Sequence, residues 1–294
     1  MDHKRRRKLL ARYRITHGKH FELKDHDPRD TDGIDIDKDE GKQLLAEGVE
    51  RLAELQGLLY ADGRHAVLAA FQAMDAGGKD GTIKHVMSGV NPQGVTVTSF
   101  KQPGPVEMAH DFLWRIHLNA PMRGRIGIFN RSHYEEVLVA KVHPAVLDNQ
   151  NLPHADRDKK FWRHRYEDIS NFELMLSRQG TTILKFFLHL SKDEQRERFL
   201  ARIDEPDKNW KFSASDLKER GYWDAYQEAY EDAIRATATP HAPWFVIPAD
   251  RKWYGRLLVV EAMIDALEGL DLKAPAPPDA SVLADARRAL EKED

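Results

Sequence analysis

Short apolar runs alternate with amphipathic segments along most of this chain. Leucines spaced three and four positions apart over residues 40–60 predict an amphipathic helix. From residue 66 onwards, apolar runs of strand length alternate with patterns of helical period, which favours an α/β fold with a central parallel five-stranded sheet flanked by helices. The predicted strands are 66–74, 94–100, 125–130, 181–189 and 244–248. The predicted helices around them are 79–89, 106–118, 132–141, 160–178, 191–203, 221–237 and 253–268.

The first predicted strand ends in a glycine-rich turn that contains one lysine. Because Gly77 and Gly78 have no Cβ, backbone N–H groups can close around phosphate oxygens there, while the next helix points its positive end at them. Lys79 can reach the same anion. The stretch departs from the phosphate-loop pattern G-x-x-x-x-G-K-[ST], since Ala73 replaces the first glycine and Asp80 replaces the Ser or Thr.

An acidic residue lies inside this loop. Asp75 would repel phosphate unless a divalent cation lay between the two negative groups. The loop therefore predicts a site that takes phosphate and Mg²⁺ together. The alternative is an ordinary glycine-rich turn between a strand and a helix, with a lysine at its rim.

The third predicted strand ends in Asn130, which Arg131 follows. In open parallel sheets ligands bind beyond the carboxyl ends of the strands, so both residues are candidates for the site. Asn130 offers a metal one neutral carbonyl oxygen, so that Asp75 and substrate phosphates would supply more of its ligands. Arg131 can clamp phosphate through two parallel hydrogen bonds. The alternative is a turn asparagine followed by a surface arginine.

Basic residues gather again over residues 191–220. Arg198 and Arg202 share one helix face, and Lys208 and Lys211 follow beside Trp210. Phosphoryl transfer is catalysed largely by positioning and by cationic stabilisation, and a closing basic lid supplies both. The alternative is a solvent-facing helix carrying Arg–Glu pairs.

Charge and composition narrow the kinds of partner. The chain has 294 residues and 41% hydrophobic content, enough to bury a full core, but its formal charge is only −3. Basic sites must therefore be local, and nucleic acid is not an expected partner. Cysteine is absent, which excludes disulfides and thiolate catalysis. No apolar segment approaches the roughly 20 residues that cross a bilayer, and the basic N-terminus lacks a signal-peptide core, so we expect no membrane association and a cytoplasmic protein.

Composition also divides the chain into three parts. Residues 1–37 begin with a basic run and are expected to form an arm, either solvated and mobile or able to grip a polyanion. Residues 38–270 hold the alternating pattern and the lid at about 191–220. Residues 271–294 are a proline-rich linker and a tail, with a candidate helix at 279–292.

Four segments carry a resemblance to a known family: MDAGGKDGTIKHV (74–86), GVNPQG (89–94), HDFLWR (110–115) and IFNRSHYEE (128–136). In that order they resemble the polyphosphate kinase 2 family, and Asn130 in place of aspartate resembles its class III branch. The resemblance implies a P-loop kinase fold with a helical lid, so that residues 38–270 would be the kinase domain. It also implies transfer of a terminal phosphoryl group between inorganic polyphosphate and nucleoside mono- or diphosphates.

The same resemblance implies the substrates and the cofactor. AMP and ADP are the expected acceptors, with GDP in addition, so the expected partners are polyphosphate and adenine or guanine nucleotides. Mg²⁺ is the expected cofactor, and Mn²⁺ is expected to replace it. The family's members imply a homo-oligomer, either a dimer or a tetramer.

Roles follow for the positions that match the family. Asp75 would hold Mg²⁺ and orient the acceptor phosphate, and Asn130 would support the metal. Lys79 would bind the acceptor phosphates near the transfer point, so that Asp75, Lys79 and Arg131 form the expected catalytic set. The expected phosphate-binding residues are the loop residues Ala76, Gly77, Gly78, Asp80, Gly81 and Thr82 and the lid residues Arg198, Arg202, Lys208 and Lys211. Asp80 is alternatively an orienting residue of the loop.

Two other functions stay open from the sequence. An ATP-dependent nucleoside monophosphate kinase could use the same fold, because a phosphate loop alone does not identify its anion. A nucleotide-sensing interaction protein would bind nucleotide and a protein partner without transferring phosphate. Donor choice separates the first of these from a polyphosphate kinase, and transfer itself separates the second.

Overall fold

A six-stranded sheet forms the centre of this computed structural model, which describes residues 1–150, 152–153 and 156–293. The strand order is β1-β6-β5-β2-β4-β3. Five strands run parallel: β2 (Ala66–Gln72), β3 (Val95–Ser99), β4 (Ile126–Asn130), β5 (Thr181–His189) and β6 (Trp244–Pro248). These five predicted strands are confirmed, but the predicted strand count is one short. β1 (Arg14–Ile15) pairs antiparallel with β6, and two residues are too few to show a period in the sequence.

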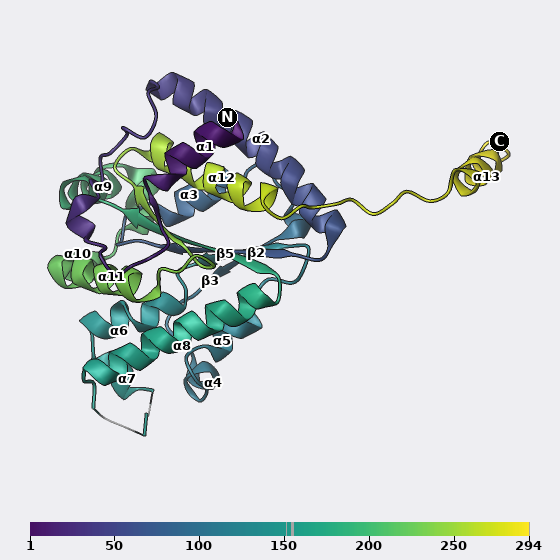
Figure 1. The fold of residues 1–294 in the computed structure, drawn as a ribbon. Helices are drawn as coiled ribbons and strands as arrows, with labels where there is room; N and C mark the ends of the chain where they lie inside the picture. The colour runs from purple at the N-terminus through teal and green to yellow at the C-terminus, as the bar shows by residue number, and fades with distance from the viewer. Residues whose placement is uncertain (151, 154–155, 294) are drawn as a thin grey trace.

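Helices cover both faces of the sheet (Figure 1). This explains why β2 is apolar along nearly its whole length, since all seven of its residues are buried. The helices above the sheet in Figure 1 are α1 (His3–Ala11), α2 (Lys38–Asp62), α3 (Lys79–Val86) and α12 (Lys252–Glu268). Those below it are α4 (Pro105–Met108), α5 (Trp114–Leu118), α6 (Val139–Val142), α7 (Ala145–Asp148), α8 (Lys159–Arg178) and α11 (Trp223–Thr237).

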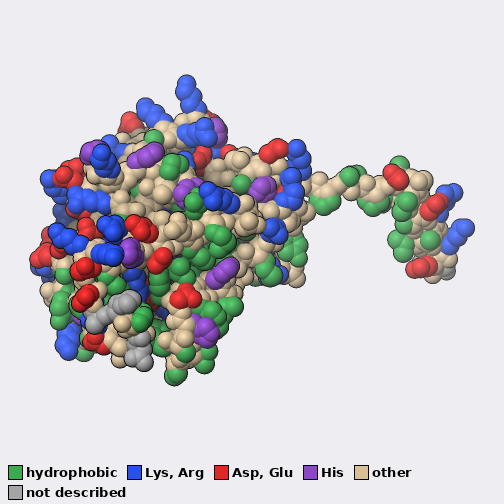
Figure 2. Space-filling model, turned by 60° about the horizontal axis from the view of Figure 1, so that its bottom comes forward, with side chains coloured by type: hydrophobic (Ala, Val, Ile, Leu, Met, Phe, Trp, Pro, Cys, Tyr) green, Lys and Arg blue, Asp and Glu red, His purple; other side chains and the backbone are tan. Residues whose placement is uncertain are grey.

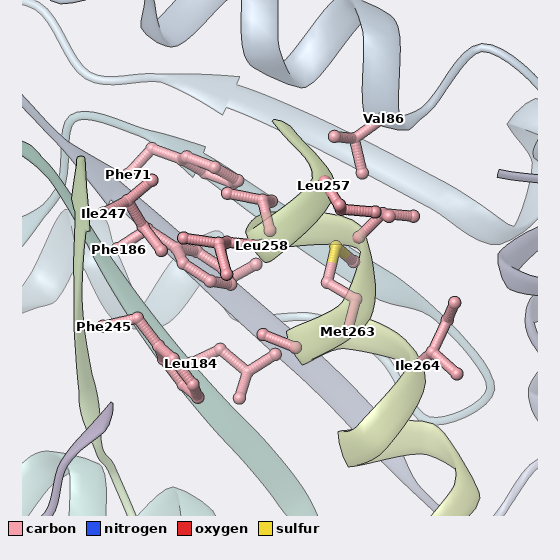
Figure 3. Close-up of a cluster of buried hydrophobic side chains, with 14 of the residues drawn as sticks. Phe71, Val86, Leu184, Phe186, Phe245, Ile247, Leu257, Leu258, Met263 and Ile264 are labelled. Atoms are coloured by element: carbon pink, nitrogen blue, oxygen red, sulfur yellow. The ribbon is translucent and has the colours of Figure 1, made fainter. Parts of the chain in front are cut away.

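A large apolar cluster joins the sheet to α12 (Figure 3). Phe186 of β5 lies between Phe71 of β2 and Phe245 of β6, with ring centroids 4.9 and 5.4 Å apart. Leu258 of α12 points toward these rings and Leu257 belongs to the same cluster, and both are fully buried. Burying one such leucine contributes about 2 kcal/mol to folding. The cluster therefore fixes α12 against the strands, and with it the polar residues at the start of α12.

The basic N-terminus packs on the body. α1 lies against α12, and Arg6 is only 3% exposed. Its guanidinium Nε lies 2.6 Å from a carboxylate oxygen of Glu261 and its Nη1 lies 2.6 Å from one of Glu268. The expectation of a solvated arm is therefore wrong at Arg6, because two carboxylates more than 250 positions away in the sequence satisfy its charge. The boundary at residues 37 and 38 stays a prediction.

Two of the predicted helices are broken. Residues 106–118 form α4 and α5, separated by a turn in which the Asp111 carboxylate accepts a hydrogen bond from Leu113 N at 2.9 Å. Residues 132–141 form the 3₁₀ helix η3 (His133–Glu136) and then α6. The other predicted helices form within a few residues of the predicted bounds. Two further 3₁₀ turns, η1 (Leu23–Asp25) and η2 (Pro92–Gly94), lie in loops.

The predicted C-terminal helix forms as α13 (Ala280–Leu290), which an extended linker holds away from the body (Figure 1). On the face of the body shown in Figure 2, basic and acidic side chains are interspersed, in keeping with the small net charge. Across the described ranges, every helix is too short or too polar to span a bilayer.

The carboxyl ends of the parallel strands meet at one edge of the sheet, where three functional segments begin. The glycine-rich loop and α3 follow β2, Asn130 closes β4, and the lid follows β5. The lid consists of α9 (Lys192–Asp204), the 3₁₀ helix η4 (Pro206–Lys211) and α10 (Ala214–Arg220). The fold thus brings the predicted loop, the predicted metal-supporting strand and the predicted lid to one place.

Candidate active site

A cavity of about 1270 Å³ lies at this edge of the sheet. Its walls come from the glycine-rich loop, the end of β4, the lid and the start of α12. The cavity is lined by all of the residues that the sequence places in the site: Asp75, Ala76, Gly77, Gly78, Lys79, Asp80, Gly81, Thr82, Asn130, Arg131, Arg198, Arg202, Lys208 and Lys211. The structure therefore brings the candidates together, and their individual roles stay predictions.

The glycine-rich loop has the strained backbone of a tight anion-binding turn. Ala76 and Gly78 both take the left-handed conformation, with φ of 60° and 94°. A Cβ on Gly77 would lie 2.5 Å from Ala73 Cβ and 2.8 Å from the Met74 carbonyl oxygen, so only glycine fits there. Gly78 is the N-cap of α3 and has no side chain to accept hydrogen bonds, which leaves the first N–H groups of the helix for a ligand.

Lys79 lies across the loop. Its Nζ donates a hydrogen bond to the carbonyl oxygen of Ala73 at 2.7 Å. Burial lowers the pKa of Lys79 and the charge of Arg131 lowers it further, while Asp75 opposes both. An anion bound in the loop would favour the charged ammonium. The Lys79 side chain is therefore placed to bind phosphate. In this structure its ammonium group is hydrogen-bonded to the Ala73 carbonyl oxygen.

Arg131 joins the loop to the strand beside it. Its Nη2 lies 3.3 Å from Asp75 Oδ1, and its Nη1 lies 3.2 Å from Glu135 Oε2. The nearby Glu135 carboxylate raises the pKa of Arg131, so the guanidinium stays charged. Its backbone is left-handed, with φ of 64°, and its N–H donates to the Phe71 carbonyl at 3.1 Å. The backbone of Arg131 is thus fixed beside the loop, and its side chain pairs with two carboxylates there.

Asn130 and Asp80 form a pair at the rim of the loop. Asn130 Nδ2 donates to Asp80 Oδ1 at 2.6 Å, which leaves the amide oxygen of Asn130 for another partner. The described residues contain no group of three or more His, Asp or Glu side chains arranged to hold a metal. Asp75 and the Asn130 oxygen still fit Mg²⁺, which typically binds one or two protein carboxylates and completes its shell with phosphate oxygens and water.

The lid contacts the loop directly. Arg198 of α9 donates to the carbonyl oxygen of Ala76 at 3.0 Å and to that of Ala249 at 2.6 Å. Gln195 Nε2 donates to the Asp75 carbonyl oxygen at 2.9 Å. These bonds connect α9 to the phosphate loop and to the end of β6.

The other lid cations have acidic neighbours. Arg202 Nη1 lies 3.2 Å from Asp216 Oδ2, and Lys208 pairs with Glu205. Neither of these is an Arg–Glu pair within one helix, which is the kind of pair that the alternative interpretation predicts, and both cations also face the cavity. Lys211 lies over the ring of Trp210, 5.0 Å from its centroid, and that ring is 78% exposed at the cavity wall.

Two cations of α12 line the cavity and were not predicted. Lys252 and Arg256 lie one helical turn apart, and Arg256 Nη2 lies 3.6 Å from the position of a Cβ on Gly81. In the part of the chain that the structure describes, neither side chain forms an ion pair with a carboxylate. Burial lowers the pKa of both groups, and the charge of Arg198 lowers it further. These are mutually repelling cations that an anion would stabilise.

Another part of the cavity lining contains more apolar surface. Phe100, Met108, Val139 and Val146 line it, together with Asn149 and the charged side chains Lys101, Arg115, Glu135 and Glu136. Apolar surface with few polar groups suits a planar base, whereas a wall of cations suits a chain of phosphates. The cavity thus offers apolar surface from one set of residues and cations from another.

Comparisons with known proteins identify the family to which the chain is similar. A family model described as "Polyphosphate kinase 2 (PPK2)" matches residues 35–275. The chain is 54% identical over 249 residues to an ADP-polyphosphate phosphotransferase of Rhodopseudomonas palustris, covering 84% of this chain and 86% of that protein. It is 50% identical over 272 residues to an AMP/ADP-polyphosphate phosphotransferase of Meiothermus ruber, covering 92% and 98%. The crystal structure of polyphosphate kinase 2 from Arthrobacter aurescens TC1 superimposes with a TM-score of 0.86 at 44% identity, covering 95% of each chain.

Proposed function

Because the chain belongs to the polyphosphate kinase 2 family, we propose that this cavity transfers a terminal phosphoryl group between inorganic polyphosphate and AMP or ADP. The family assignment makes the chain a polyphosphate phosphotransferase, which is the predicted enzyme class. The observation that carries the site assignment is that Asp75 and Lys79 lie on one glycine-rich loop and that Asp75 forms an ion pair with Arg131. A carboxylate beside phosphate-binding cations fits a site that takes phosphate together with a divalent cation.

Each group around the loop has a proposed task. Lys79 and the loop N–H groups bind the acceptor phosphate near the transfer point, so Lys79 exchanges its bond to the Ala73 carbonyl for one to phosphate. Arg131 turns from Glu135 to the transferred group, where its two N–H groups stabilise the charge on the equatorial oxygens. Asp75 and Asn130 would hold Mg²⁺, which neutralises charge on the phosphates when bound.

The two walls of the cavity separate the two substrates. We propose that the base of the acceptor lies against Phe100, Met108 and Val146, and that the donor chain follows the cations of the lid and of α12. Closure of the lid over the chain would exclude water, which would otherwise accept the phosphoryl group. The apolar wall supports an acceptor that carries a base.

A donor and acceptor assay tests the function. The protein is incubated with Mg²⁺ and polyphosphate plus AMP, ADP or GDP in separate reactions, and with Mg²⁺, ATP and AMP in another. The nucleotides formed are separated by anion-exchange chromatography. We expect ADP and ATP from AMP, and ATP from ADP. Turnover of AMP with ATP as donor, without turnover of polyphosphate, would instead support an ATP-dependent monophosphate kinase. Nucleotide binding with no transfer from either donor would support the nucleotide-sensing alternative.

Substitution of the two α12 cations tests the donor path. Lys252→Ala and Arg256→Ala are each expected to raise the KM for long-chain polyphosphate about tenfold, since each removes one charged contact to phosphate. The KM for AMP is expected to stay within about twofold. Arg251→Ala is the matched control, because Arg251 is exposed, lies next to Lys252 and does not line the cavity. A parallel increase in the KM for AMP would place the acceptor on this wall and contradict the assignment.

A further inference from the structure

A buried polar network connects the turn that follows β4 to β5 and α8. Lys185 of β5 and Glu173 of α8 are both 0% exposed, and Lys185 Nζ lies 2.6 Å from Glu173 Oε2. Lys185 Nζ also donates to the Tyr134 hydroxyl at 2.9 Å and to the Thr237 carbonyl oxygen at 2.8 Å. All three protons of the ammonium group therefore have acceptors. Glu173 Oε1 accepts from the Tyr134 hydroxyl at 2.8 Å and lies 3.2 Å from His133 Nε2.

Stability alone does not explain a charged pair in this position. Removing two charges from water costs several kcal/mol per ion, and well-packed apolar residues of similar volume are often as stable or more so. Burial opposes ionisation of Glu173, but the neighbouring Lys185 and His133 hold the pKa of its carboxyl below the usual range. Burial lowers the pKa of Lys185, and Glu173 opposes that shift. The hydrogen bonds of the pair are directed at two residues of η3.

These bonds reach η3, which is too short to be stable without contacts to the rest of the protein. η3 is a 3₁₀ helix of four residues, which has little stability of its own. Ser132 caps it by accepting from Tyr134 N at 3.2 Å, and Ser132 Oγ in turn accepts from Gln72 Nε2 at 3.0 Å. The network fixes the other side of the same turn through the ring and hydroxyl of Tyr134, which is fully buried. The turn is thus anchored to α8, β5 and the end of β2.

This turn carries two residues of the proposed site. Arg131 immediately precedes Ser132 and has a left-handed backbone, a conformation that costs a non-glycine residue about 1 kcal/mol and persists only where the surroundings fix it. Glu135, the partner of Arg131, is the third residue of η3. A shift of η3 would therefore displace the Arg131 guanidinium from Asp75.

We propose that Tyr134, Glu173 and Lys185 form a positioning network. This network fixes the position of the Arg131 guanidinium relative to Asp75 in the glycine-rich loop. The network touches no substrate and acts on phosphoryl transfer only through the β4–η3 turn. This inference rests on the proposed function, because it takes Arg131 as the group that stabilises the transferred phosphoryl. A misplacement of about 1 Å at such a group is enough to cost up to 10²-fold in rate.

Removing one hydroxyl tests the network. Tyr134→Phe is expected to lower kcat about tenfold with AMP and polyphosphate, while the KM of each substrate stays within about twofold. The matched control is Tyr166→Phe on α8, since the Tyr166 hydroxyl is buried and has no hydrogen-bond partner among the residues described. The control is expected to keep kcat within about twofold. An unchanged kcat in Tyr134→Phe would overturn the proposal.

A double-mutant cycle separates positioning from general stability. In an Arg131→Ala background, Tyr134→Phe is expected to lower kcat by less than about twofold, because the group that the network positions is already absent. A tenfold loss in both backgrounds would show that the network does not act through Arg131 and would overturn the inference. If Tyr134→Phe fails to fold, the apolar pair Glu173→Leu with Lys185→Met takes its place in the same cycle. Activity of the unchanged protein on polyphosphate tests the proposed function separately.

Discussion

Lys79→Ala is expected to lower kcat for phosphoryl transfer by about 10³-fold or more. Lys79 is the cation of the glycine-rich loop, and its Nζ is held 2.7 Å from the Ala73 carbonyl oxygen, within the turn that would surround phosphate. Removal of one preorganised donor to a developing charge costs about 10²- to 10³-fold, and the lysine also carries a full charge. Steady-state rates with AMP and long-chain polyphosphate give the measurement.

The fold is expected to survive this change. Lys79 makes its hydrogen bond to the Ala73 backbone carbonyl and no ion pair with the described residues, so its loss leaves no buried ion pair broken. Lys84→Ala is the matched control, because Lys84 lies on the same helix, is exposed and does not line the cavity. Thermal unfolding of both variants checks the fold. A rate near that of the unchanged protein in Lys79→Ala would remove this lysine from the mechanism.

The glycine-rich loop could be placed at the cavity because its residues are adjacent in the sequence. Its two glycines, its lysine and Asp75 are adjacent, so no long-range packing is needed to bring them together. The predicted strand 66–74 was two residues too long, since the apolar Ala73 and Met74 continue the strand pattern but already belong to the turn. The left-handed backbone of Ala76 has no sequence signal, because alanine is not typical of that conformation.

Other features of the fold and the site could not be predicted, because they depend on contacts between segments that are distant in the sequence. Lys252 and Arg256 begin a helix whose sequence indicates only a buried core element, and they become candidates once α12 is seen to pack beside the loop. Similarly, Arg6 finds its carboxylates on α12, and β1 finds its partner in β6. Periodicity identifies which face of a helix is apolar, but it does not give the neighbour of that face. The residues that the sequence did not identify are therefore those whose neighbours in the fold are distant in the sequence.

The lid helix α9 has features of both interpretations, a phosphate-binding lid and a helix that carries Arg–Glu pairs. The Arg198–Glu194 pair, with Nε and Oε1 2.9 Å apart, is the helix pair that the structural alternative predicts. The same guanidinium also donates to two carbonyl oxygens of the site, which the alternative does not predict. Four-residue spacing is the same in both cases, so the sequence could not separate a helix-stabilising pair from a contact to the loop.

Asp75→Asn is expected to lower kcat by about 10²- to 10³-fold and to raise the Mg²⁺ concentration needed for half-maximal rate. The substitution keeps the size of the side chain and removes its charge. Asp75 is the carboxylate of the loop that would bring a divalent cation to the phosphates, and an amide oxygen is a weaker ligand for Mg²⁺. Rates measured over a series of Mg²⁺ concentrations give both values.

The Mg²⁺ series separates the two tasks that the structure allows for Asp75. Its Oδ1 also lies 3.3 Å from Arg131 Nη2, so the carboxylate could act only by orienting that guanidinium. In that case Asp75→Asn would lower the rate but leave the Mg²⁺ dependence unchanged, and the metal assignment would be wrong. Asp224→Asn is the matched control, since Asp224 is exposed on α11 and does not line the cavity. A shifted Mg²⁺ dependence in Asp75→Asn alone would support a carboxylate that holds the metal between the loop and the phosphates.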